Sequence, residues 1–151
     1  MPATAARFPI TLEATAGSLV PVTILTAIPI CQFGLSAGCA AAILLFACLL
    51  VHELGHIVVA TCKGVRVKAL GFSVLGPYIR RRRCETAADE FWVSLAGPAF
   101  SLAAAIAMWE LGVLGRWVGA LNLVLALSNL LPMRGSDGWR ALRAAKRCLS
   151  N

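Results

Sequence analysis

Residues 40–51 are twelve consecutive apolar residues that run directly into the sequence His52-Glu53-Leu54-Gly55-His56. Successive residues of an α-helix are rotated by about 100°, so histidines four residues apart project from nearly the same face. Two imidazoles at this spacing suit a single Zn²⁺, and the glutamate beside them is suited to act as a general base. A zinc-binding helix in a soluble domain needs no such apolar run. The pattern therefore predicts water-dependent chemistry inside a segment that excludes water.

The composition is that of an integral membrane protein. Only 14% of the 151 residues are charged and 59% are hydrophobic, whereas soluble domains carry about 25% charged residues. The net charge of +7 is therefore interpreted as a determinant of membrane topology, and no basic-aromatic pattern indicates a nucleic-acid partner. The six cysteines form no CxxC pair, so neither a zinc ribbon nor a disulfide framework is indicated. Cys48, one turn before His52, is assigned to packing.

Four apolar segments are long enough to cross a membrane as helices. They cover about residues 17–33, 38–61, 90–111 and 113–133. The polar loop 62–89 shows alternating apolar and polar residues and a Gly76-Pro77 turn signal, which predict a short β-hairpin over residues 64–82 at the membrane surface. The tail, residues 134–151, is expected to form an amphipathic helix on that surface. The predicted fold class is α: a polytopic membrane helical bundle in a single domain, residues 1–151.

The basic residues predict the orientation of this bundle. With four spans, the N-terminus, the loop 62–89 and the tail lie on one side, which holds every Lys and Arg except Arg116. The positive-inside rule places that side in the cytoplasm. We therefore expect a multi-pass membrane protein, in the inner membrane if bacterial, with both termini cytoplasmic and His52 and His56 in the cytoplasmic third of the bilayer.

A catalytic zinc ion needs a third protein ligand and an open position for water. Ionisable residues inside a span are costly and are functional hypotheses by default. Glu13 and Glu110 lie near the wrong side or end, which leaves the Glu85-Asp89-Glu90 cluster and Asp137 as candidates. Asp137 follows the fourth span at about the depth of the histidines, in a segment whose proline and glycines favour a broken, cavity-lining loop. The role of third metal ligand is therefore favoured for Asp137 over that of a simple helix cap.

Three motifs together resemble the site-2 protease family of intramembrane zinc metalloproteases. They are HELGH at the end of one span, Ala96-Gly97-Pro98 in the next, and Asn-Leu-Leu-Pro-Met-Arg-Gly-Ser-Asp-Gly over residues 129–138. The resemblance covers about residues 38–140. The chain departs from the family pattern at Ser136, where leucine is usual, at Arg134 and Gly135, where prolines are common, and at Ser101, where asparagine is common.

The resemblance implies roles for individual residues. His52, His56 and Asp137 would bind one catalytic Zn²⁺, and Glu53 would activate water. Asn129 would hold the scissile carbonyl. The hairpin would bind an unwound substrate strand by β-addition, with Gly71, Phe72 and Ser73 as the expected contacts.

The implied function is regulated intramembrane proteolysis. The enzyme would hydrolyse a peptide bond within or near the transmembrane segment of a single-span membrane protein. The expected partners are that substrate, the lipid bilayer and a membrane regulator.

Two alternatives remain open at this stage. Residues 85–89, Glu-Thr-Ala-Ala-Asp, fit the ExxxD pattern of CAAX-protease-like membrane metallopeptidases, with Glu85 as the third ligand. The other alternative is a zinc-binding membrane protein without catalytic activity, such as a transporter. A transporter is expected to show internal repeats or polar groups along a path through the membrane. Here the polar groups gather on one side.

Overall fold

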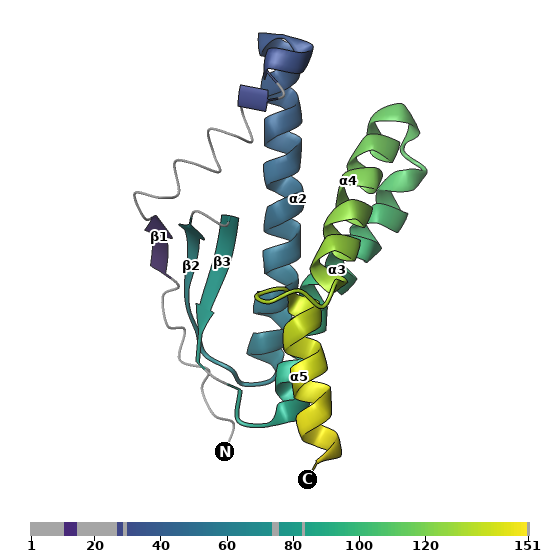
Figure 1. Ribbon diagram of the computed structural model, residues 1–151. Coiled ribbons are helices and arrows are strands. Elements are labelled where there is room, and N and C mark those ends of the chain that lie inside the picture. The colour runs from purple at the N-terminus through teal and green to yellow at the C-terminus, as the bar shows by residue number, and fades with distance from the viewer. Residues whose placement is uncertain (1–10, 15–26, 29, 74–75, 83, 151) are drawn as a thin grey trace, which may run out of the picture.

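The computed structural model describes residues 11–14, 27–28, 30–73, 76–82 and 84–150. Figure 1 shows a long helix with a small sheet on one side and the other labelled helices on the opposite side. The elements are β1 (Thr11–Ala14), α2 (Leu35–Cys62), β2 (Val67–Ser73), β3 (Gly76–Arg81), α3 (Ala87–Trp109), α4 (Gly112–Leu130) and α5 (Asp137–Leu149).

Within the described residues, three helices, α2, α3 and α4, are long and apolar enough to cross a membrane. Their 28, 23 and 19 residues correspond to about 42, 35 and 29 Å of helix, against a hydrocarbon core of about 30 Å. They coincide with the second, third and fourth predicted spans, with ends shifted by a few residues. The first predicted span, residues 17–33, falls mostly outside the described residues.

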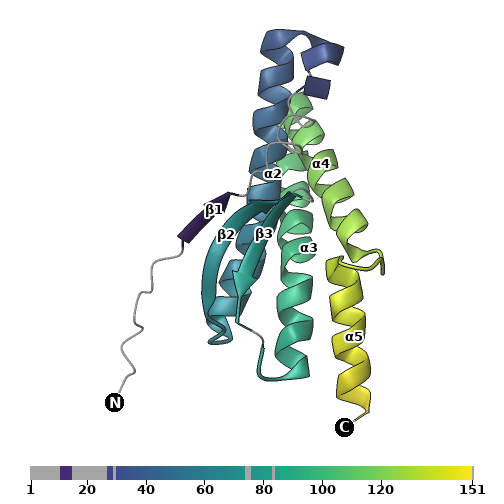
Figure 2. The same cartoon turned by 60° about the vertical axis from the view of Figure 1, so that its left-hand side comes forward.

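Helix α3 lies at the centre of the bundle, packed against α2, α4 and α5 (Figure 2). Small residues allow α2 and α3 to approach closely. A Cβ atom at Gly55 would lie 2.6 Å from the carbonyl oxygen of Ala96, a distance that real Cβ atoms do not adopt. The glycine of the HELGH sequence therefore brings the histidine-bearing turn of α2 against the Ala96-Gly97-Pro98 turn of α3.

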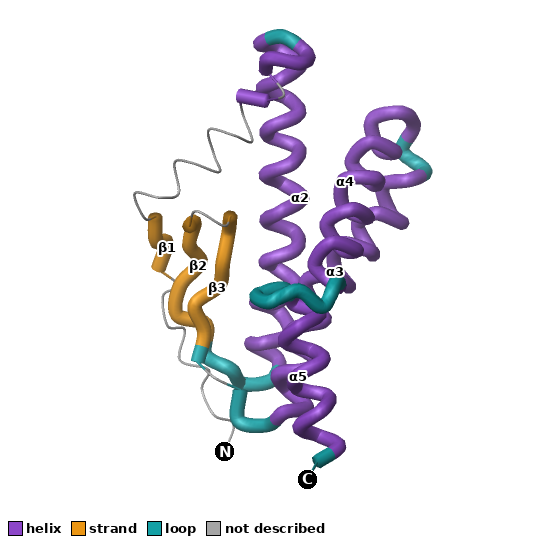
Figure 3. The backbone as a smooth tube through the Cα atoms, viewed as in Figure 1, coloured by secondary structure: helices purple, strands orange, loops and turns teal. Residues whose placement is uncertain are grey.

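The three strands form one sheet in the order β1-β2-β3, with β1 parallel and β3 antiparallel to β2. The tube in Figure 3 shows it beside the C-terminal half of α2. The predicted hairpin is confirmed as β2 and β3. Strand β1 was not predicted; it is tied to β3 across β2, because Glu13 accepts a hydrogen bond from Tyr78 (3.3 Å) and pairs with Arg80.

A non-helical loop, residues 131–136, separates α4 from α5. Ser136 is the N-cap of α5, and its Oγ accepts a hydrogen bond from the Trp139 amide at 3.1 Å. The capping role is thus taken by the residue before Asp137, which leaves the Asp137 carboxylate free to point into the bundle. Gly138 permits this turn, because a Cβ atom there would collide with the carbonyl of Leu130.

Candidate metal centre

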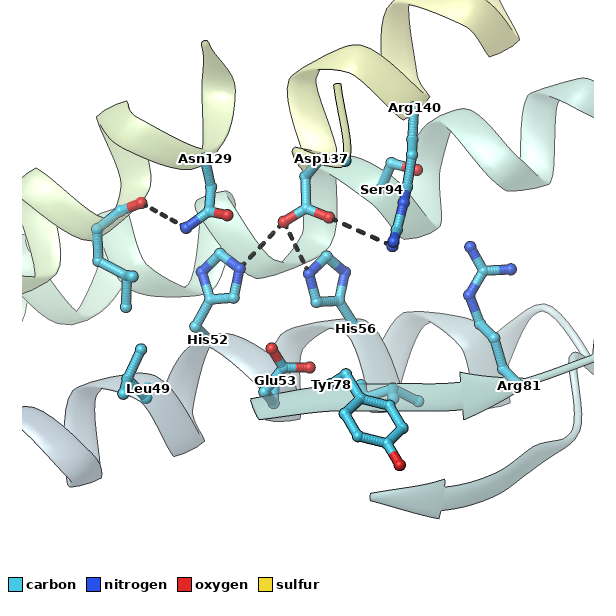
Figure 4. A pocket seen from close by; sticks show the side chains of 13 residues that line it. Leu49, His52, Glu53, His56, Tyr78, Arg81, Ser94, Asn129, Asp137 and Arg140 are labelled. Atoms are coloured by element: carbon cyan, nitrogen blue, oxygen red, sulfur yellow. Dashed lines mark hydrogen bonds and ion pairs between the residues drawn. The ribbon is translucent and has the colours of Figure 1, made fainter. Parts of the chain in front are cut away.

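His52, His56 and Asp137 meet in the middle of the bundle, and all three are buried. Asp137 Oδ2 lies 3.1 Å from Nε2 of His52 and 3.1 Å from Nε2 of His56. Figure 4 shows the two imidazoles of α2 converging on the carboxylate from α5. Ligands of a tetrahedral zinc ion with bonds of about 2.0–2.1 Å lie about 3.3 Å apart. The two distances from the carboxylate oxygen are close to that value.

The far side of each imidazole is held by α3. His56 Nδ1 donates a hydrogen bond to the carbonyl oxygen of Val93 at 2.7 Å, and His52 Nδ1 lies 3.0 Å from Ser101 Oγ. A carbonyl can only accept, so Nε2 of a neutral His56 carries a lone pair directed at a carboxylate oxygen. Two lone pairs at this distance repel unless a positive charge lies with them. Three ligand atoms that lie within 4.8 Å of one another, two imidazole nitrogens and a carboxylate oxygen, fit a divalent cation.

Gly97 faces the two ligating nitrogens directly. A Cβ atom at this position would lie 2.7 Å from Nε2 of His52 and still closer to Nε2 of His56. Only a residue without a side chain leaves room there for the imidazoles and an ion. The Ala96-Gly97-Pro98 motif thus gains a physical role: its glycine forms one wall of the metal centre.

A cavity of about 370 Å³ opens at the trio. Glu53 and Asn129, the two predicted catalytic residues, both line it. Glu53 is 9% exposed, and in Figure 4 its carboxylate lies between the two histidines. Asn129 donates a hydrogen bond from Nδ2 to the carbonyl oxygen of Leu125 at 3.0 Å and lies near His52. The structure thus gathers five predicted residues, from three helices, around one space.

Three charged or aromatic residues that sequence reasoning did not select also line the cavity: Tyr78, Arg81 and Arg140. Arg140 Nη1 lies 3.9 Å from Asp137 Oδ1, the oxygen turned away from the histidines. Arg81 makes a bidentate ion pair with Glu90, with distances of 2.7 and 3.1 Å. This pair joins the end of β3 to the first turn of α3 and fixes the strand beside the cavity.

The three predicted substrate contacts occupy a different position. Gly71, Phe72 and Ser73 belong to the central strand β2, whereas the described strand residues that line the cavity, Tyr78, Ile79 and Arg81, belong to β3. Gly71 and Phe72 pair with β1 on one side and with β3 on the other. Their backbone groups therefore have no free edge for an added strand. Among the described strands, the edge beside the metal centre belongs to β3.

The Glu85 alternative finds no support in the geometry. Glu85 and Asp89 line a separate cavity of about 250 Å³ together with Lys63, and Asp89 pairs with Lys63 at 3.3 Å.

Burial raises the pKa of the Cys84 thiol to about 11, so this thiol remains protonated at neutral pH. Cys48 is buried and accepts a hydrogen bond from Asn122 at 3.1 Å, which accords with a packing role.

Two serines of α3 near the metal centre were not predicted as site residues from the sequence. Ser94, Gly97 and Ser101 stand at positions i, i+3 and i+7, so they share one helix face. Ser94 lines the cavity, and Ser101 contacts His52. The helical spacing of small and polar residues around Ala96-Gly97-Pro98 was the available signal.

Ser101→Ala tests the support of the histidine. The substitution removes the partner of His52 Nδ1 and leaves the three ligands in place. Loss of such an outer hydrogen bond typically costs 10–100-fold in metal affinity. We expect a fall of that size in zinc affinity, measured by competition with a chelator, and recovery with Ser101→Asn. An unchanged affinity in Ser101→Ala would show that this contact does not orient the ligand.

Comparison with known proteins agrees with this geometry. The family model described as Peptidase family M50 matches residues 40–116, just over half of the chain. The chain belongs to peptidase family M50. Two relatives of this M50 chain carry the name "Putative zinc metalloprotease". One, sll0528 of Synechocystis, is 35% identical, and the other, Rip3 of Mycobacterium tuberculosis, is 36% identical. In each case the match covers 71% of this chain and 31% of the relative.

The M50 chain therefore spans about a third of the length of the curated relatives it matches. Among solved structures, the site-2 protease from Methanocaldococcus jannaschii is similar, with a TM-score of 0.75 and 25% sequence identity. That match covers 91% of this chain and 69% of the archaeal one. Family membership and the three apolar helices agree with the composition: this M50 chain is a multi-pass membrane protein.

Proposed function

We propose that this chain is a zinc-dependent endopeptidase that hydrolyses a peptide bond within or near the transmembrane segment of another membrane protein. One observation carries the proposal. A three-residue metal centre with a free carboxylate, Glu53, lies in a cavity partway along an apolar membrane helix. Mere metal binding does not need Glu53. The names of the relatives, zinc metalloprotease and site-2 protease, support the same reading.

The chemistry follows from the residues around the cavity. A zinc ion held by His52, His56 and Asp137 would supply Lewis acidity to the scissile carbonyl and to a water molecule. Glu53 takes a proton from the attacking water and delivers it to the leaving amine. The Asn129 amide uses one N–H for the Leu125 carbonyl. Its second N–H is available to hold a backbone carbonyl of the bound substrate.

The substrate strand is proposed to add to β3 instead of β2. A transmembrane helix hides its carbonyls in internal hydrogen bonds, so it must unwind before attack. An extended segment then needs new backbone partners, which a free strand edge provides. Tyr78, Ile79 and Arg81 of β3 line the cavity, so a strand paired with this edge would pass the metal centre. This proposal replaces the contacts expected at Gly71, Phe72 and Ser73.

The positive-inside rule supports a cytoplasmic orientation for the metal centre. His52 and His56 lie about 26 and 32 Å along α2 from its first residue, counted at 1.5 Å per residue. The basic loop after α2 and the basic residues of α5 lie beyond that depth on the same side. We place this side in the cytoplasm. The proposed partner is therefore a single-span protein whose scissile bond lies in the cytoplasmic third of the bilayer.

The Asp137→Ala and Glu85→Ala variants test the proposed centre against the alternative one. We expect Asp137→Ala to lose most of its zinc affinity, because two histidines alone hold the ion weakly, and to lose cleavage. Glu85→Ala should retain both. Zinc content after dialysis and cleavage of a single-span peptide in liposomes provide the measurements. Full zinc and activity in Asp137→Ala would refute the assignment.

A further inference from the structure

Ser94 is a buried hydroxyl without a hydrogen-bond partner among the described residues. Its side chain is among the most buried in the chain, at 1% exposed, and it lines the cavity of the metal centre. Nearly all buried polar side chains have a partner, so an orphan in a native structure requires an explanation. Because Ser94 lines the cavity, a group that enters the cavity can supply the missing partner.

The position of Ser94 is set by its neighbours on α3. Val93, the preceding residue, accepts the hydrogen bond of His56, and Gly97, one turn further on, abuts both ligating nitrogens. Ser94 is therefore at the His56 side of the centre. In Figure 4 it appears beside Asp137 and Arg140, whereas Asn129 lies near His52. The cavity thus holds one neutral polar group toward each end.

Two ordinary roles for this serine do not fit. A serine within a helix often bonds the carbonyl four residues earlier, but Ser94 Oγ has no such bond. A serine nucleophile needs a free histidine nitrogen as its base. The Nδ1 atoms of His52 and His56 are engaged by Ser101 and Val93, and both Nε2 atoms face Asp137.

We propose that Ser94 is a further catalytic residue: its hydroxyl donates a hydrogen bond to the scissile carbonyl oxygen as that oxygen gains negative charge. This inference rests on the proposed peptidase function. The Ser94 proton stays on Ser94 throughout, so no bond to the serine forms or breaks. A preorganised donor of this kind stabilises the transition state more than the bound substrate.

Ser94→Ala tests the inference, with Ser128→Ala as the matched control. Ser128 is an exposed serine of α4 whose hydroxyl donates to the Leu125 carbonyl. Loss of one such donor lowers kcat by about 10²–10³-fold. We expect a fall of that size in Ser94→Ala, with KM and zinc content unchanged. The metal-free Ser94→Ala protein should unfold at the same or a higher temperature, because an unsatisfied buried hydroxyl has been removed.

A second readout separates this inference from the function on which it rests. A phosphinic peptide mimics the tetrahedral transition state, so its affinity for the zinc-loaded protein should fall in Ser94→Ala by the same factor as kcat/KM. Equal affinity in the two proteins would overturn the role of Ser94, even if no cleavable substrate is found. Loss of zinc or of thermal stability in Ser94→Ala would overturn it too, in favour of a structural role. If the unchanged chain cleaves no membrane substrate, the peptidase proposal fails instead.

Discussion

Gly97→Ala is expected to yield a folded protein that holds no zinc and cleaves nothing. The added methyl group would occupy the space in front of His52 and His56, 2.7 Å from Nε2 of His52 and closer still to that of His56. These contacts are too short for either imidazole to keep its place. The position has an ordinary helical backbone, and alanine is a better helix former than glycine by about 0.8–1.0 kcal/mol. The loss is therefore steric and local.

Zinc stoichiometry of the purified Gly97→Ala protein measures this effect, with circular dichroism to follow the helices. Ala103→Gly serves as a control, because Ala103 is an exposed residue of the same helix. That change weakens α3 slightly and should leave zinc bound. A Gly97→Ala protein that binds zinc as tightly as the unchanged chain would show that α3 does not form the wall of the centre.

Glu53→Gln is expected to keep zinc and to lose hydrolysis by about 10²–10⁴-fold, the usual contribution of a general base. Glutamine has nearly the same shape, but it cannot accept a proton from water at neutral pH. Glu53 lines the cavity, while the group of converging ligand atoms is formed by His52, His56 and Asp137. Metal binding and proton transfer should therefore separate in this variant.

The measurements are zinc content and the initial rate of cleavage of a single-span peptide in liposomes. Glu110→Gln provides the control, since Glu110 is an exposed residue that follows the far end of α3. Equal rates in Glu53→Gln and the unchanged chain would defeat the peptidase proposal. Loss of zinc in Glu53→Gln would instead identify Glu53 as a ligand.

Much of the centre could be predicted because its signals are local. Two histidines four residues apart share a helix face whatever surrounds them, and an apolar run predicts a membrane helix from its length alone. Asp137 could be predicted because few carboxylates reach the depth of the histidines in the membrane. Its approach to the histidines, with Oδ2 at 3.1 Å from each Nε2, is seen only in the structure.

Other features depend on which faces meet in three dimensions. Strand β1 has only four residues, and it pairs with a strand more than fifty residues later, so nothing in its own sequence predicts it. Its position also makes β2 the central strand, which moves the free edge to β3. Ser94 and Ser101 resemble any small residue of an apolar helix until α2 is placed against α3. Ser136 stands where leucine is usual in the family, and only the structure explains this difference, because Ser136 is the N-cap of α5.

Mass spectrometry of the products from a single-span substrate tests the central claim most directly. The zinc-loaded chain and its Glu53→Gln variant are each incubated with the same substrate in liposomes, with and without a chelator. We predict a new N-terminus within or near the apolar segment, on its cytoplasmic side, only with the zinc-loaded unchanged chain. An intact substrate in every sample, or the same cut with Glu53→Gln, would contradict the account.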